Sequence, residues 1–337
     1  MTGSEAICGH VPVLLEEVLE GLAIRQGGVY LDGTLGWGGH TLQILQRYEG
    51  TRVIGLDRDT VALEAASRRL VDYGDRVLFF QSDFRRLDEV LDDIGVELVD
   101  GVLLDLGVSS MQLEDADRGF SFSQDGPLDM RMTPDSGIAA SEIVNTWSQE
   151  DLANLIFRFG EEKRSRAIAR AIVREREKAP VVTTLRLAEL ISSVPGMGRM
   201  RNIHPATRTF QALRIEVNDE LDAVRQAIPV SVERLTPGGR LAIISFHSLE
   251  DRIVKRAFRE MESPCRCPKE FPECRCGKVS EGRVVTRRPV IPTDEEITAN
   301  PRSRSAKLRV FEKKKPEARI QNPEEDKDLD QILNCEP

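Results

Sequence analysis

The segment Asp32-Gly-Thr-Leu-Gly-Trp-Gly-Gly-His40 decides the fold. It continues from an apolar segment at residues 29–32, and a second apolar segment, residues 52–57, ends in Asp57, 21 positions after Gly36. Glycines directly after a strand let the backbone approach a ligand closely, and an acidic residue that ends the next strand can accept hydrogen bonds from both hydroxyls of a ribose. The spacing therefore predicts an α/β sheet that binds an adenosine-containing cofactor at its strand ends.

Further apolar segments continue the pattern at residues 77–81, 99–104, 240–246 and 308–311, and helical periodicity separates several of them. Strands that alternate with helices predict a parallel sheet. The third and fourth segments run into Ser82-Asp-Phe84 and Asp105-Leu-Gly-Val-Ser-Ser110. In an open α/β sheet ligands bind at the carboxyl ends of the strands, so these polar ends should converge on one site.

A large insertion interrupts the sheet, because 134 residues separate Asp105 from Arg240 and a crossover needs only a few tens. Helical patterns fill it at residues 148–159, 161–178 and 185–192, and residues 206–228 predict one long helix that returns to the sheet. We expect an α/β domain of residues 1–112 and 215–315, an inserted all-helical domain of residues 113–214, and a disordered acidic tail at 316–337.

Composition narrows the class of protein. Of 337 residues, 40% are apolar and 31% charged, which predicts a packed core. No window approaches the roughly 18 to 20 apolar residues of a membrane span, and the N-terminus lacks a signal-peptide pattern, so we expect a cytosolic protein. The net charge of −9 argues against a protein that only coats nucleic acid. Residues 252–315, however, carry 18 Lys and Arg against 9 Asp and Glu, which suits contacts with phosphates.

The glycine segment favours S-adenosylmethionine over NAD. A dinucleotide site expects G-x-G-x-x-G at the start of a helix that holds a pyrophosphate, and this chain lacks that spacing. Asp32, directly before the glycines, suits a cationic ligand with a sulfonium and an amino group. An NAD-dependent oxidoreductase is therefore disfavoured.

Two strand ends carry candidate catalytic residues: Asp105 and Ser109 after one strand, and His247 after another. Methylation of an exocyclic amine requires the nitrogen to be held in line with the methyl donor, with acceptors on its N–H bonds. These three residues could supply the acceptors, although His247 reads equally well as a helix N-cap or a core histidine. Methylation of a pyrimidine carbon would need a nucleophilic cysteine, and none follows a strand.

Four of the six cysteines, Cys265, Cys267, Cys274 and Cys276, lie within twelve residues. Four thiolates would satisfy a tetrahedral structural zinc ion. Paired C-x-C is less typical of zinc than C-x-x-C, so thiols without a metal remain the alternative.

Several long motifs resemble the bacterial small-subunit ribosomal RNA cytosine-N4 methyltransferases, over about Cys8 to Lys313. The matching stretches are His10–Glu16, Asp32–His40, Asp105–Ser110, Arg118–Phe122, Asp125–Met132, His204–Arg214, Phe246–Arg252 and Asn300–Ser305. The resemblance implies a Rossmann-like methyltransferase domain with a helical insertion. It also implies S-adenosylmethionine-dependent methylation, in the cytoplasm, of the N4 amine of a cytidine in the decoding region of 16S rRNA.

The resemblance further implies the site residues. The cofactor contacts would be Gly38, Gly39, His40, Asp57, Phe84, Asp105 and Gln112, and Arg302 and Arg304 would contact RNA phosphates. The target cytidine would have to leave its stack. Three alternatives stay open: methylation of another nucleic-acid amine, such as cytosine N4 or adenine N6 of DNA, a ribosome assembly factor that senses the cofactor without catalysis, and a homodimer in place of a monomer.

Overall fold

A computed structural model of the chain describes residues 12–133, 136–197, 203–265, 267 and 275–315. Its centre is a seven-stranded sheet in the order β3-β2-β1-β4-β5-β7-β6. The strands are β1 (Val29–Asp32), β2 (Arg52–Asp57), β3 (Val77–Gln81), β4 (Val99–Asp105), β5 (Leu235–Ser245), β6 (Gly282–Val284) and β7 (Lys307–Lys313). The first five strands are parallel, and β7 is antiparallel to both β5 and β6. The predicted α/β class is confirmed, with the short edge strand β6 as an addition.

The order of the strands creates a switch point between β1 and β4. From β1 the chain continues to β2 and β3 on one side, and the later strands β4 and β5 lie on the other side. Asp32, at the end of β1, pairs with Leu103 of β4. In open α/β sheets ligands bind at such a point, outside the carboxyl ends of the strands. The Rossmann-like topology therefore places the loops after β1 and β4 side by side.

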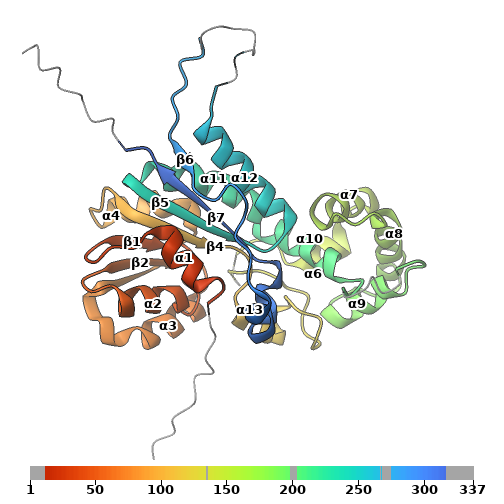
Figure 1. Cartoon of the computed structure of the whole chain (residues 1–337). Helices are drawn as coiled ribbons and strands as arrows, with labels where there is room; N and C mark the ends of the chain where they lie inside the picture. The colour runs from red at the N-terminus through yellow and green to blue at the C-terminus, as the bar shows by residue number, and fades with distance from the viewer. Residues whose placement is uncertain (1–11, 134–135, 198–202, 266, 268–274, 316–337) are drawn as a thin grey trace, which may run out of the picture.

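Helices cover both faces of the sheet (Figure 1): α1 (Leu15–Leu22), α2 (Gly39–Arg47) and α3 (Thr60–Arg69), then α4 (Leu87–Asp93), α11 (Glu220–Glu233) and α12 (Ser248–Glu262). Alternate residues of β4 point to opposite faces: Leu103 packs with α1, whereas Val102 and Leu104 pack in the cluster with Val224 and Phe258. Both faces are apolar, as expected for parallel strands buried on two sides.

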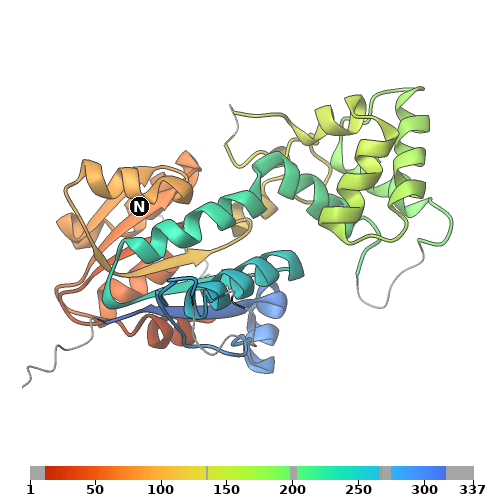
Figure 2. The same ribbon diagram turned by 90° about the horizontal axis from the view of Figure 1, so that it is seen from above.

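The insertion is helical, as predicted, and lies to one side of the sheet (Figure 2). It contains α6 (Ala140–Thr146), α7 (Gln149–Gly160), α8 (Ser165–Arg176), α9 (Thr184–Ser192) and α10 (Thr207–Asn218). These helices share one cluster of buried apolar side chains that includes Ile143, Ile156, Ile168, Leu187 and Leu213. Ser148 caps α7 by accepting a hydrogen bond from the Asp151 amide, as its position in the sequence predicts. The insertion thus has its own core.

The predicted single helix over residues 206–228 is wrong. The chain breaks at Asp219, whose φ of 50° and ψ of 39° are left-handed, and α11 begins at the next residue. Arg214 of α10 and Glu220 of α11 span the break through two hydrogen bonds of 2.8 Å, Nε to Oε1 and Nη2 to Oε2. Asn218 donates from Nδ2 to the Met130 carbonyl at 2.8 Å. Buried polar contacts, which leave the apolar periodicity intact, therefore hold the two helices at an angle.

Replacement of Glu220 by alanine should lower the free energy of unfolding by about 3–5 kcal/mol, because it leaves the buried guanidinium of Arg214 without its partner. Urea unfolding followed by circular dichroism measures the change. The matched control is Asp222→Ala, which removes an exposed partner of Arg225 on the same helix and should cost below about 1 kcal/mol. Equal losses in the two variants would show that the Arg214–Glu220 pair does not stabilise the break.

Candidate active site

The loop after β1 is fixed by the carboxylate of Asp32, which is buried. Its Oδ1 accepts a hydrogen bond from the Thr34 amide at 3.3 Å, and its Oδ2 accepts one from Thr41 Oγ1 at 2.8 Å. Burial raises the pKa of Asp32 to about 6, although both hydrogen bonds favour the charged form. Gly38 precedes α2 with a φ of 70°, and a Cβ there would lie 2.8 Å from Leu70 Cδ1. The left-handed φ and the contact with Leu70 therefore both favour glycine at position 38.

Asp57 lies at the end of β2, as predicted, and faces the same loop. Its Oδ2 accepts from the Gly36 amide at 2.8 Å and its Oδ1 from the Asp59 amide at 2.9 Å. Burial raises the pKa of this carboxyl. Each carboxylate oxygen can accept a second hydrogen bond, so Asp57 retains the capacity to bind the two hydroxyls of a ribose.

Asp105, at the end of β4, has the least satisfied carboxylate of the site. Among the described residues, its buried Oδ1 has no hydrogen-bond partner, and its Oδ2 lies 4.0 Å from His40 Nδ1. His40 Nε2 lies 3.0 Å from the Val13 carbonyl, which only a protonated Nε2 can bond. Burial, followed by the charges of Asp32 and Glu250, raises the pKa of Asp105 to about 8. A carboxylate in this condition is suited to a cation or an N–H donor from a ligand.

Ser109 and Gln112 form the capping box of the short helix α5 (Ser110–Glu114). Ser109 Oγ accepts from the Gln112 amide at 3.3 Å, and Gln112 Oε1 accepts from the Ser109 amide at 3.0 Å. Gln112 Nε2 also donates to Asp59 Oδ2 at 3.0 Å, and Arg118 Nη1 lies 2.7 Å from the same oxygen. Asp59 was not among the predicted site residues, and its only signal in the sequence is its place as the N-cap of α3. Its contacts join the end of β2 to α5 and to Arg118 at the start of the insertion.

Phe84 lies beside the glycine loop, at the start of the turn η2 (Phe84–Arg86). A Cβ built on Gly33 would lie 3.1 Å from Phe84 Cβ, so the two segments are in close contact. The preceding residue, Asp83, accepts from the Arg85 amide at 2.9 Å and forms an ion pair with Arg58 at 3.4 Å. The end of β3 therefore reaches the same edge as the ends of β1, β2 and β4.

His247 is the N-cap of α12, opposite the loop after β4. Its Nδ1 accepts from the Glu250 amide at 3.3 Å, which places the ring proton on Nε2. Nε2 lies 3.3 Å from Glu250 Oε1 but has no hydrogen-bond partner among the described residues. Burial and then the charge of Arg214 lower the pKa of His247 to about 3. The neutral ring then has a donor at Nε2, which differs from the acceptor that we expected here, and a role of His247 in catalysis stays a prediction.

Glu250, which the sequence analysis did not assign, holds this strand end together. Its Oε2 accepts from the amides of Phe246 at 2.8 Å and His247 at 3.2 Å. Burial raises the pKa of Glu250 to about 7, against the opposing charge of Arg214. The glutamate three residues after an N-cap was the signal that could have found it.

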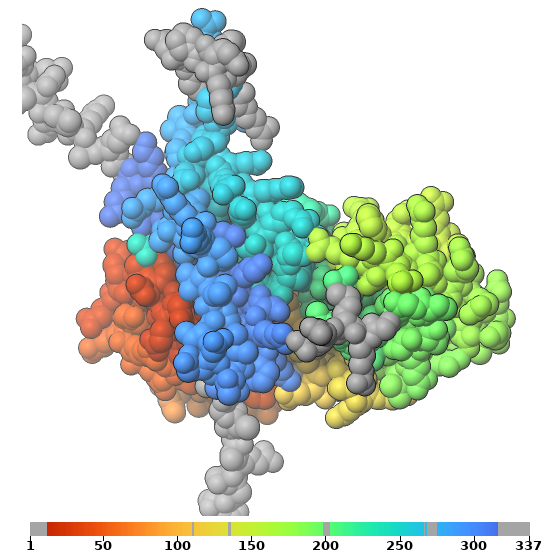
Figure 3. All heavy atoms as spheres, turned by 45° about the vertical axis from the view of Figure 1, so that its right-hand side comes forward, coloured from red at the N-terminus to blue at the C-terminus, as the bar shows by residue number. Residues whose placement is uncertain are grey.

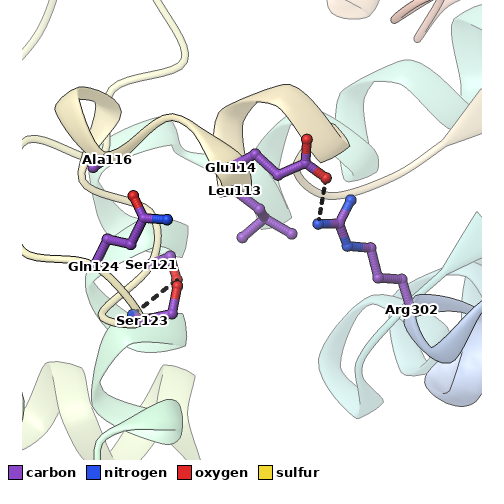
Figure 4. A pocket seen from close by; sticks show the side chains of 7 residues that line it. All are labelled: Leu113, Glu114, Ala116, Ser121, Ser123, Gln124 and Arg302. Carbon is purple, nitrogen blue, oxygen red and sulfur yellow. Dashed lines mark hydrogen bonds and ion pairs between the residues drawn. The ribbon is translucent and has the colours of Figure 1, made fainter. Parts of the chain in front are cut away.

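A cavity of about 370 Å³ lies next to α5, between residues 113–124 and the turn η4 (Pro301–Ser305) (Figure 4). Arg302 enters it from η4 and forms an ion pair of 2.9 Å with Glu114. Hydroxyls line the opposite side, where Ser121 and Ser123 are hydrogen-bonded at 2.9 Å. Arg304 lies exposed on η4. Neither Asp57 nor Asp105 lines this cavity, which therefore adjoins the strand-end site without being part of it.

The model of the MraW methylase family matches residues 7–314. This chain belongs to that family. Its relatives include the proteins named ribosomal RNA small subunit methyltransferase H of Carboxydothermus hydrogenoformans, 52% identical over 305 residues, and of Brevibacillus brevis, 50% identical over 306. The alignments cover 90% of this chain and 97% and 98% of those proteins. The protein of the same name in Geotalea uraniireducens is 51% identical, with 90% and 98% covered.

Membership of this methylase family makes S-adenosylmethionine the cofactor to test against the site. The unpartnered Oδ1 of Asp105 fits a cationic group, and Asp57 fits a ribose. Gly38 and Gly39 let this loop pack closely on the protein, because a Cβ on Gly39 would lie 2.9 Å from Pro12 Cγ. The two carboxylates therefore suit this cofactor.

Three of the four clustered cysteines lie together in the structure. The sulfur atoms of Cys265, Cys267 and Cys276 all lie within 4.8 Å of one another. Cys274 lies outside the described residues, as do the N-terminal residues to 11 and the predicted tail at 316–337. In the part of the chain that the structure describes, no helix is long and apolar enough to cross a membrane.

The affinity of the MraW-family protein for S-adenosylmethionine should rise with pH through the raised pKa of Asp105, about 8. Binding a cation requires the ionised carboxylate, so affinity should increase by up to about tenfold per pH unit below that value. Without the cofactor, the free energy of unfolding should fall as the pH rises from 3.8 to about 8, because Asp105 loses its proton in the unfolded chain before it does so in the folded one. Calorimetry in buffers of different ionisation enthalpy measures both the affinity and the released proton.

The matched control is Asp105→Asn, which keeps the shape of the side chain and cannot ionise. This variant should bind S-adenosylmethionine with lower affinity, and no proton should be released when it binds. If wild type and variant released the same number of protons on binding, Asp105 would not be the titrating group.

Proposed function

We propose that this chain methylates the N4 amine of a cytidine in the decoding region of small-subunit (16S) ribosomal RNA. The relatives at about half identity carry the name of a small-subunit rRNA methyltransferase and align along nearly their whole length. The observation that carries the chemistry is at the switch point of the sheet: Oδ1 of Asp105 has no hydrogen-bond partner among the described residues. N4 as the methylated atom and cytidine as the base are what the resemblance of the motifs implies. The absence of a cysteine among the described strand-end residues disfavours methylation of a pyrimidine carbon.

The strand ends would bind and orient the cofactor. When bound, S-adenosylmethionine supplies a methyl group on a positively charged sulfur. Asp57 would hold the ribose and Phe84 would lie against the adenine. The backbone of residues 36–40 would face the methionine part of the cofactor. Gln112 would act through the capping box that positions the loop after β4, because its amide is already bonded to Ser109 and Asp59.

The base would be oriented by groups from two strand ends. The N4 lone pair of cytosine is delocalised into the ring, so an acceptor on its N–H bonds helps to redirect it toward the methyl carbon. Asp105 is that acceptor, with Ser109 Oγ beside it on the same loop. The Asp105 carboxylate would accept the proton that the N4 amine loses on methylation. His247 would donate from Nε2 to an acceptor on the pyrimidine edge.

RNA contacts outside the base would come from the cavity beside α5 and from η4. A cytidine in folded RNA must leave its stack to reach a methyl group in this crevice. Arg302, Arg304 and the hydroxyls of Ser121 and Ser123 would then face neighbouring nucleotides. In Figure 3 the blue C-terminal segment and the green insertion are both visible on one face of the molecule, so both could border one RNA strand. We assign the insertion to residues 113–214, and we place the reaction in the cytoplasm.

The product of the reaction tests the proposal directly. Purified protein with labelled cofactor should add one methyl group to unmethylated small subunits, and nucleoside analysis after digestion should find N4-methylcytidine. Asp105→Asn should reduce the rate by about 10²-fold or more, in the range found when a positioned acid or base is lost. Recovery of the label as N6-methyladenine, or transfer to DNA in preference to the subunit, would replace this function with another amine methylation.

Naked 16S rRNA in a parallel reaction shows whether assembled structure is required. A non-catalytic assembly factor would show cofactor binding without transfer on either substrate. Light scattering of the same protein decides between a monomer and a homodimer.

Reversal of the charge of both Arg302 and Arg304 to glutamate should weaken RNA binding and flatten its salt dependence. Each lost phosphate contact should reduce the slope of log affinity against log salt by about 0.7 to 0.9. Filter binding over a salt series measures the slope. The control is Arg52→Glu with Arg68→Glu, which changes the net charge equally at two exposed positions on β2 and α3. Equal slopes for the two double variants would remove η4 from the RNA surface.

A further inference from the structure

We propose that Cys265, Cys267 and Cys276 bind a structural zinc ion in the segment between α12 and β6. Their three sulfur atoms lie within 4.8 Å of one another. In a tetrahedral site with zinc–sulfur bonds of about 2.3 Å, neighbouring sulfurs are about 3.8 Å apart. A small contraction of the cluster therefore brings all three to one ion. This site is independent of the methylation proposed above.

A hydrogen bond to sulfur supports the proposal separately. The backbone amide of Arg275 donates to Cys267 Sγ at 3.4 Å. An amide directed at a sulfur stabilises the thiolate, which is the form that binds metal. Such contacts to the ligand atoms are the usual surroundings of a protein metal site.

The described part of this segment also lies outside the apolar core. None of its residues, 263–265, 267 and 275–281, is buried. Residues without a core must offset their conformational entropy in another way, and a metal ion held by several side chains can do so. The ion would hold the segment that leads to β6, the edge strand that pairs with β7.

The donor set indicates zinc, and the location indicates a structural ion. Thiolates favour zinc over magnesium, calcium and manganese, which prefer oxygen ligands. The cluster follows the C-terminal end of α12, whereas His247 precedes its N-terminal end, and the 15 residues of this helix span about 22 Å. The ion would therefore stand away from Asp105 and the methylated base.

Zinc content of the full-length chain, purified in reducing buffer without chelator, tests the site. We expect one zinc per chain by elemental mass spectrometry and near-complete loss in Cys267→Ser. The matched control, Cys8→Ser with Cys335→Ser, replaces the two cysteines outside the motif and should keep the zinc. Binding of S-adenosylmethionine reports folding, and its affinity should be unchanged in all variants because Asp105 lies at the other end of α12.

Cobalt added to the metal-free wild type provides a test without substitutions. Charge-transfer absorption from at least three thiolates is expected, and absorption from fewer would overturn the proposal. Three further results would also overturn it: no zinc bound even when zinc is supplied against a chromophoric chelator, equal zinc in Cys267→Ser and wild type, or a native mass two hydrogens lighter with no metal. The last result would identify a disulfide.

Discussion

The site depends on the carboxylate of Asp105, at the junction of two strand ends, because its buried Oδ1 has no hydrogen-bond donor among the described residues. Asp105 ends β4 beside β1, and burial together with the charges of Asp32 and Glu250 raises its pKa to about 8. A cation or an N–H donor stabilises the ionised form of such a group. Methylation of an amine brings both to one place: a cationic methyl donor and a nitrogen that must lose a proton.

The polar side chains around Asp105 act mainly on the backbone. Thr34 Oγ1 accepts from the Asp105 amide at 2.6 Å, Asp57 accepts from the amide of Gly36, and Ser109 with Gln112 caps α5. These contacts determine the path of each loop as it leaves its strand, while Asp105 itself remains available. The loops of the site are therefore held by the chain's own side chains, which is the arrangement that favours catalysis by positioning.

The insertion is attached through the same group of charges. Arg214 of α10 pairs with Glu220 of α11 across the break at Asp219, and the charge of Arg214 lowers the pKa of His247. A second contact joins Arg252 of α12 to Glu161, at the end of α7, at 3.0 Å. The orientation of the insertion and the electrostatics of the crevice thus depend on shared residues.

The sequence by itself determined the α/β class, nearly every strand and the helical insertion, because apolar periodicity and glycine positions involve residues that are close together in the sequence. It also located Asp57 and Asp105, since the carboxyl ends of parallel strands must meet at one edge. Only the tertiary structure decided the break at Asp219, the partners of Asp59 and Glu250, and the proton on His247 Nε2. These depend on contacts between residues far apart in the chain and on burial, which changes the pKa of a group without any change in its neighbours along the sequence.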